Sequence, residues 1–96
     1  MFYIYFLYSE KHDKYYVGYS DDPERRLLEH NTDTRMTFTH KFRPWILKAY
    51  YPVSENRGQA IKIERFIKKQ KNKLFIQKII ENSQLFEAIV NKTIND

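Results

Sequence analysis

Residues 2–20 read FYIYFLYSEKHDKYYVGYS, two aromatic segments separated by a short polar one. Phe2–Tyr8 and Lys14–Tyr19 are rich in tyrosine and other bulky side chains, a composition typical of β-strands. The five residues between them, Ser9–Asp13, are polar and suit a turn. This stretch therefore predicts an antiparallel hairpin at the start of the fold.

The next stretch predicts a helix, a loop and a third strand. Asp22 can cap a helix whose first residue is Pro23, because proline has no N–H to leave unpaired there, and we expect this helix to end near Asn31. Residues 32–44 have no clear period and are expected to form a long loop, a kind of segment that is often functional. Trp45–Val53 has the composition of a strand.

Helical periodicity begins at Gln59 and continues to the end of the chain. Apolar residues recur at helical spacing after Gln59 and again in Asn72–Glu81, and Ser83 is expected to cap a last short helix. The order ββαβαα with a short C-terminal helix predicts an α+β fold, a small three-stranded antiparallel sheet flanked by helices. With 96 residues the chain is expected to be one domain, residues 1–96, in which residues 82–96 are a short C-terminal helical extension.

Composition narrows the chemistry. The chain has no cysteine, which excludes disulfides and thiolate metal sites and fits a reducing cytoplasm. The uncharged N-terminal run is too short for a membrane helix, so no membrane association is expected. The net charge of +5 and the clustering of lysines favour a polyanionic partner such as nucleic acid.

The tyrosines of the hairpin are the first candidate site residues. Side chains alternate faces along a strand, so Tyr5 and Tyr16 meet on one face if odd-numbered residues of the first strand pair with even-numbered ones of the second. Two phenols there could hold or deprotonate a water molecule. Gly18 adds weight, because glycine within a strand often marks a close approach. The alternative is that tyrosine is simply a good strand residue.

Arg26 and His30 are spaced i, i+4, so they project from one helix face. A guanidinium matches phosphate oxygens and can stabilise charge that grows in a transition state. The alternative is a solvated surface pair with Glu29 as a neighbouring acid.

Glu64 borders the apolar stripe of its helix, so its carboxylate is partly desolvated and needs a partner. A hard cation such as Mg²⁺ can be held by a single protein carboxylate together with water and phosphate oxygens. The alternative is an i, i+4 ion pair with Lys68. Substrate phosphates are expected to lie across the basic residues that follow, which are Lys68, Lys69, Lys71 and Lys73, although most charge runs are solvated faces.

Taken together, Tyr3-Ile4-Tyr5, Tyr16-Val17-Gly18, the Arg26/His30 pair and Glu64 resemble the GIY-YIG nuclease family, over Tyr3 to about Lys73. Tyr3 stands where the family name has Gly, and Val17 where it has Ile. The resemblance is closest to the small stand-alone bacterial members, which are similar to the nuclease domain of the ABC excinuclease.

The resemblance implies a metal-dependent endonuclease with low sequence specificity that hydrolyses phosphodiester bonds in nucleic acid, with DNA favoured over RNA as the substrate and RNA left open. It implies that Glu64 holds Mg²⁺ or Mn²⁺, that Tyr5 or Tyr16 is the general base, that Arg26 stabilises the transition state and that His30 assists in positioning. The protein is expected to be a cytoplasmic monomer or weak homodimer.

Two other readings of the sequence remain open. One is a non-catalytic nucleic-acid-binding module in which a sheet-face platform stacks bases while lysines track the backbone; its aromatic residues would be Phe2, Tyr3, Tyr5 and Tyr15. The other is a protein-interaction domain whose exposed aromatics are buried in a partner.

Overall fold

The predicted hairpin is the start of a three-stranded sheet. A computed structural model describes residues 1–33 and 38–95 of the chain. β1 (Phe2–Ser9) and β2 (Lys14–Ser20) pair antiparallel, and β3 (Ile46–Ser54) pairs antiparallel with the other side of β1. The strand order is β2-β1-β3, so the first strand in sequence is the central strand in space. This confirms the predicted antiparallel sheet and the α+β class.

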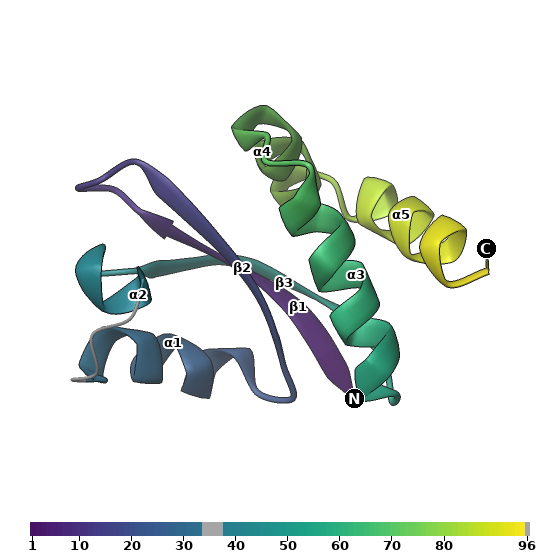
Figure 1. Cartoon of the computed structure of the whole chain (residues 1–96), viewed down its shortest axis with the longest axis horizontal. Helices are drawn as coiled ribbons and strands as arrows, with labels where there is room; N and C mark the ends of the chain where they lie inside the picture. The colour runs from purple at the N-terminus through teal and green to yellow at the C-terminus, as the bar shows by residue number, and fades with distance from the viewer. Residues whose placement is uncertain (34–37, 96) are drawn as a thin grey trace.

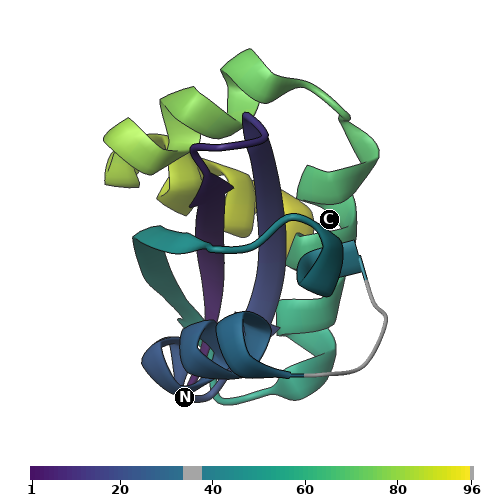
Figure 2. The ribbon, with the colours of Figure 1, turned by 90° about the vertical axis from the view of Figure 1, so that its left-hand side faces the viewer.

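Helices cover both faces of this sheet (Figure 1). α1 (Pro23–Thr32) and α2 (Phe38–Lys41) lie on one face. The other face is covered by α3 (Arg57–Lys69), α4 (Lys73–Glu81) and α5 (Ser83–Asn95). Figure 2 shows the sheet from the α1 side, with α3 running alongside the edge strand β2. Within the described ranges, no helix is long and apolar enough to cross a membrane.

The central strand explains why both faces are covered. Ile4 and Phe6 of β1 are fully buried in the cluster formed with α3, α4 and α5. Tyr5 and Leu7, which point the other way, are equally buried beneath α1 and α2. A strand with no solvent face reads as a continuous apolar and aromatic run, because neither of its two sets of alternating side chains meets water.

The start of α1 follows the sequence prediction. The carboxylate of Asp22 accepts a hydrogen bond from the backbone N–H of Arg25 at 3.1 Å, and Pro23 occupies the first helical position. The helix continues to Thr32, one residue beyond the predicted end.

The predicted loop 32–44 is wrong in part, because α2 forms within it. The Trp45 indole donates a hydrogen bond to the carbonyl of Thr39 at 2.8 Å, and Phe38 and Phe42 pack beside Trp45 and each other. These are tertiary contacts. A helix of four residues is too short to show a periodic pattern in the sequence, so it could not be predicted from periodicity. Residues 34–37 of the predicted loop lie outside the described residues.

Two other helix starts differ from the predictions. α3 begins at Arg57 rather than Gln59, because the side chain of Asn56 accepts from the backbone of Gln59 and caps a turn that starts earlier. The cap of α5 is Asn82, not Ser83; its side chain accepts from the backbone N–H groups of residues 84 and 85.

The last helix also contributes more to the core than an extension would. α5 is 13 residues long, longer than the short helix that the sequence predicts. Phe86 is fully buried and packs edge-on against Phe6 of the central strand, and Ile89 belongs to the same cluster. Burial of these side chains fixes the helix against the sheet.

Candidate active site

The strand register brings the two tyrosines together. Tyr5 is paired with Gly18, and Leu7 with Tyr16, so odd-numbered residues of β1 face even-numbered ones of β2. Tyr5 and Tyr16 consequently lie on the face covered by α1, with ring centroids 6.2 Å apart. The pairing of odd-numbered with even-numbered residues, on which the predicted meeting of the two tyrosines depends, is thus present.

Gly18 makes room for the Tyr5 ring. A methyl group at residue 18 would overlap the ring and hydroxyl of Tyr5. The absence of a side chain at Gly18 therefore lets the phenol lie across β2, toward the edge of the sheet. This is the close approach that a glycine within a strand indicates.

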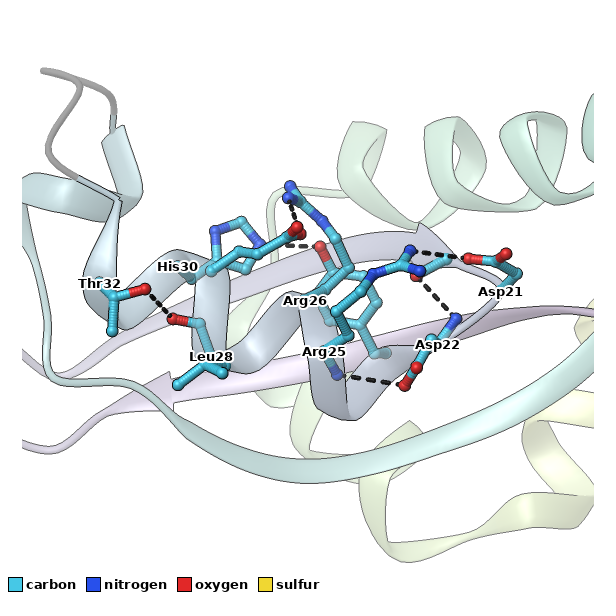
Figure 3. A network of polar contacts seen from close by, with 10 residues as sticks. Asp21, Asp22, Arg25, Arg26, Leu28, His30 and Thr32 are labelled. Carbon is cyan, nitrogen blue, oxygen red and sulfur yellow. Dashed lines mark hydrogen bonds and ion pairs between the residues drawn. The ribbon is translucent and has the colours of Figure 1, made fainter.

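Arg26 and His30 rise from the same side of α1 (Figure 3). His30 is buried, and its Nε2 shares a 2.8 Å hydrogen bond with the hydroxyl of Tyr5. The alternative of a solvated surface pair therefore does not hold for His30, although Arg26 does have Glu29 as its neighbouring acid. Arg26 donates to the carboxylate of Glu29 at 2.7 Å and keeps about a third of its side chain exposed.

Burial sets the protonation of the Tyr5–His30 pair. Burial, reinforced by the positive charge of Arg26, lowers the pKa of His30 to about 4. Burial also raises the pKa of Tyr5, and the neighbouring Tyr16 adds to that shift while Arg26 opposes it. At neutral pH both groups are uncharged, so His30 holds the phenol by a neutral hydrogen bond and fixes where its oxygen points.

Glu64 reaches this face from α3, on the far side of the β2 edge. Its side chain is only 16% exposed and forms an ion pair with Lys68 at 3.0 Å. The Lys68 ammonium also lies 4.9 Å above the ring of Tyr16. The i, i+4 ion pair offered as an alternative for Glu64 is present, and the same carboxylate also faces the tyrosines.

One pocket of about 410 Å³ collects most of these groups. Tyr5, Tyr16, Arg26 and Glu64 all line it, although they come from four different elements. His30 instead lines a smaller neighbouring hollow of about 170 Å³, which shares Tyr16 and Arg26 with the first. The other residues around the larger pocket are Phe2, Gly18, Tyr19, Ser20, Asp21, Arg25 and Arg57.

The carboxylates of this pocket suit a hard cation with few protein ligands. Residues 1–33 and 38–95 contain no group of three or more His, Cys, Asp or Glu side chains that could enclose a metal. Glu64 and Asp21 line the pocket, and Asp21 is paired with Arg25 at 2.9 Å. A single shielded carboxylate fits Mg²⁺ or Mn²⁺, because Mg²⁺ retains water and takes phosphate oxygens as its remaining ligands.

The basic residues after Glu64 lie at different distances from the pocket. Lys68 is next to it, through its contacts with Glu64 and Tyr16. Lys69 is exposed near the end of α3. Lys71 and Lys73 line a separate hollow of about 190 Å³, and Lys73 is tied to Asp13 of the hairpin turn at 2.7 Å.

Sequence reasoning missed three residues near the site. Arg57 lines the larger pocket with its guanidinium 5.1 Å from the Phe2 ring, and Arg25 lines it beside Arg26. Phe38 lines the smaller hollow from α2. Arg57 is a basic residue next to a helix cap, which was a weak signal in the sequence. Phe38 lies in a stretch without helical or strand periodicity, so no signal pointed to it.

Comparison with known proteins identifies the family of the chain. The family model described as the GIY-YIG catalytic domain matches residues 1–79. The chain belongs to the GIY-YIG family. The match ends within α4, so it includes every strand and all five candidate catalytic residues of this GIY-YIG domain.

Two curated relatives give the same family context. The domain is 36% identical over 58 residues to the structure-specific endonuclease subunit SLX1 of Ajellomyces capsulatus, covering 56% of the chain and 14% of that protein. It is 40% identical over 57 residues to a UPF0213 protein of Enterococcus faecalis, covering 57% of the chain and 64% of the relative. The aligned part thus spans less than two thirds of either relative. No solved structure matches the chain.

Proposed function

We propose that this GIY-YIG domain is a metal-dependent endonuclease that hydrolyses phosphodiester bonds in nucleic acid with low sequence specificity, with DNA favoured over RNA as the substrate. The observation that carries the proposal is the single pocket lined by Tyr5, Tyr16, Arg26 and Glu64. Packing alone does not require two phenols, a guanidinium and a shielded carboxylate from four elements to converge. Membership of the family and the likeness to an endonuclease subunit support it further.

Arg26 is proposed to bind the scissile phosphate. Its guanidinium lines the pocket and is partly exposed, so a phosphate can reach it. Glu29 holds the guanidinium in place from the side. A preorganised donor of this kind stabilises most where negative charge increases, on the phosphate oxygens of the transition state.

Tyr5 or Tyr16 is proposed to accept a proton from the attacking water. Because burial raises the pKa of Tyr5, its phenol is a poor base unless positive charge lies nearby. His30 is proposed as a positioning residue, since its hydrogen bond fixes the Tyr5 hydroxyl at the boundary between the two hollows.

Glu64 is the residue proposed to hold Mg²⁺ or Mn²⁺. When bound, such a cation neutralises charge on the phosphate and on the leaving oxygen. Without it, the Glu64 carboxylate is balanced by Lys68. The exposed Lys69 and Lys71, with Lys68 and Lys73, are proposed to contact substrate phosphates. A cytoplasmic, monomeric or weakly dimeric protein remains our expectation.

The alternative function, a non-catalytic nucleic-acid-binding module, required a platform of aromatic residues on one face of the sheet. Tyr5 is only 1% exposed, so a base cannot stack on it. Tyr15 packs against Tyr8 on the α4 side of the sheet, whereas Tyr3 lies on the opposite face with Tyr5. The four aromatic residues therefore do not form one surface.

The decisive experiment compares the wild type with Glu64→Gln. We expect the wild type to cleave single-stranded, duplex or branched DNA with Mg²⁺ or Mn²⁺, and Glu64→Gln to lose that activity while unfolding at nearly the same temperature. The stability change should stay small, because the Glu64–Lys68 pair is partly exposed. Glu87→Gln, an exposed glutamate on α5, is the matched control and should cleave normally. Wild-type protein that cleaves no DNA or RNA with either metal, or Glu64→Gln that cleaves at the normal rate, would contradict the proposal.

A further inference from the structure

An aromatic surface adjoins the proposed active site, and three of its four rings have no part in the chemistry above. It consists of Tyr16, Phe38, Phe42 and Trp45, hereafter the aromatic platform. The Phe38 ring is stacked beside that of Tyr16, with ring centroids 6.3 Å apart. The centroids of the Phe38 and Phe42 rings are 4.7 Å apart. Trp45 is buried below them and is fixed by its indole hydrogen bond to α2.

Phe38 is the exposed member of this platform. Its side chain is 52% exposed, although Phe42 and Trp45 already anchor α2 to the sheet. Single exposed apolar side chains are ordinary on protein surfaces, and Leu74 is more exposed than Phe38. Phe38 differs in that it lines a hollow beside the proposed active site. The structural alternative is that Phe38 only helps to pack α2 against the sheet, and the location of its ring in this hollow favours a ligand contact instead.

Lysines surround the platform. Lys14 and Lys41 lie 5.9 and 5.6 Å from the Phe42 ring, and Lys68 lies above Tyr16. Aromatic rings interleaved with cations form the usual surface for a nucleic-acid strand, in which bases stack on the rings and phosphates meet the charges. This combination selects a nucleic acid over an apolar protein segment as the occupant.

The position of Phe38 relates it to the cleaved bond. Phe38 lines the 170 Å³ hollow together with Tyr16, Arg26 and His30. Because Tyr16 and Arg26 also line the larger pocket, a phosphate held by Arg26 would have its adjacent nucleotide at this hollow.

We propose that Phe38 stacks with an unpaired nucleobase next to the phosphate bound by Arg26. This inference rests on the proposed nuclease function and makes it more specific. A base within a duplex has both faces covered by its neighbours, so it cannot offer one to Phe38 unless it leaves the stack. The preferred substrate class is therefore a strand with an unpaired nucleotide at the cleavage point, such as single-stranded DNA or the frayed base of a branch.

The test measures binding, so that it does not depend on cleavage. The probe is a short DNA oligonucleotide with 2-aminopurine in its centre, used single-stranded and as a blunt duplex, with Ca²⁺ in place of Mg²⁺. We expect wild-type protein to bind the single strand more tightly and to quench its fluorescence. Phe38→Leu should lose at least about fivefold in single-strand affinity, given that base stacking on an aromatic ring contributes roughly 5- to 150-fold, with little change for duplex.

Two control variants separate stacking from folding. Phe38→Tyr keeps the ring and should keep the preference for single strands. Phe66→Leu removes another partly exposed phenylalanine, on the side of α3 away from Glu64, and should leave binding unchanged. If Phe38→Leu does not fold, the wild-type quenching and the wild-type preference decide the question.

The opposing outcomes are distinct. Equal wild-type affinity for single strand and duplex, absence of quenching, or a folded Phe38→Leu that binds like wild type would overturn the role of Phe38. Quenching by a wild-type protein that cleaves nothing would instead uphold the platform and overturn the proposed nuclease function.

Discussion

Tyr5 and Gly18 face each other across β1 and β2, and the phenol of Tyr5 occupies the space where a side chain of residue 18 would stand. We expect Gly18→Ala to destabilise the fold by about 1–3 kcal/mol, because an added methyl must displace a buried ring. The same displacement should break the Tyr5–His30 hydrogen bond and sharply lower cleavage. Chemical denaturation and a cleavage assay measure the two effects.

Gly58→Ala is the matched control for that substitution. Gly58 lies in the first turn of α3, where a methyl group would stand 3.1 Å from the Asn56 side chain. Its effect on stability should be small, and the cleavage rate should not change. An equal loss of rate in both variants would mean that the Tyr5 geometry is not responsible.

The two tyrosine hydroxyls should differ in their effect on stability. Tyr5→Phe leaves the buried Nε2 of His30 without its partner, so we expect a loss of about 1–3 kcal/mol. Tyr16→Phe should change stability little, because Tyr16 contacts its neighbours through the faces and edges of its ring. The tyrosine that serves as general base should also lose roughly 10²–10⁴ in cleavage rate when its hydroxyl is removed. If the cleavage rate falls less than tenfold in both variants, neither phenol is the general base.

Stability should rise with pH between about 4 and 6.5 because of His30. Its pKa is near 4 in the folded protein and near 6.5 when unfolded, so between these values the unfolded chain binds more protons. The contribution is fully present above about pH 6.5, falls as pH decreases and amounts to at most about 3 kcal/mol. Urea unfolding at several pH values tests it. His30→Gln should flatten this part of the profile, whereas His12→Gln, on the hairpin turn, should not.

Arg26→Ala should reduce turnover far more than affinity. A guanidinium that acts mainly on transition-state charge contributes roughly 10²–10³ in rate. Single-turnover cleavage, beside a binding titration with Ca²⁺, separates the two quantities. Arg25→Ala is the adjacent control, since Arg25 is held by Asp21, and it should cost less. If binding and turnover fall together in Arg26→Ala, this residue is only a phosphate anchor.

DNA binding should be strongly salt-dependent. Each phosphate contact adds about −0.9 to the slope of log affinity against log salt on duplex DNA. Lys69→Glu should lower both affinity and slope, because Lys69 is exposed in the basic run. Lys92→Glu, on the exposed side of α5, should change the slope much less. An affinity that is constant between low and high salt would rule out the basic run as a binding surface.

The local sequence pattern was enough to predict the strands and helices that are long and regular. The hairpin, the third strand and the Asp22 cap of α1 follow from composition and capping chemistry within a few residues. The order of tyrosines, Arg26, His30 and Glu64 was enough to indicate the family, which the match over residues 1–79 confirms. The roles of those residues in catalysis remain predictions.

Only the tertiary structure decided how these residues meet. Strand register placed Tyr5 over Gly18, and the packing of α3 along the β2 edge turned Glu64 toward the tyrosines. α2 and its exposed Phe38 were invisible in the sequence, because their position depends on contacts with Trp45 and Tyr16 rather than on periodicity. Local signals specify helices and strands, but register and burial arise from side chains that are distant in the sequence.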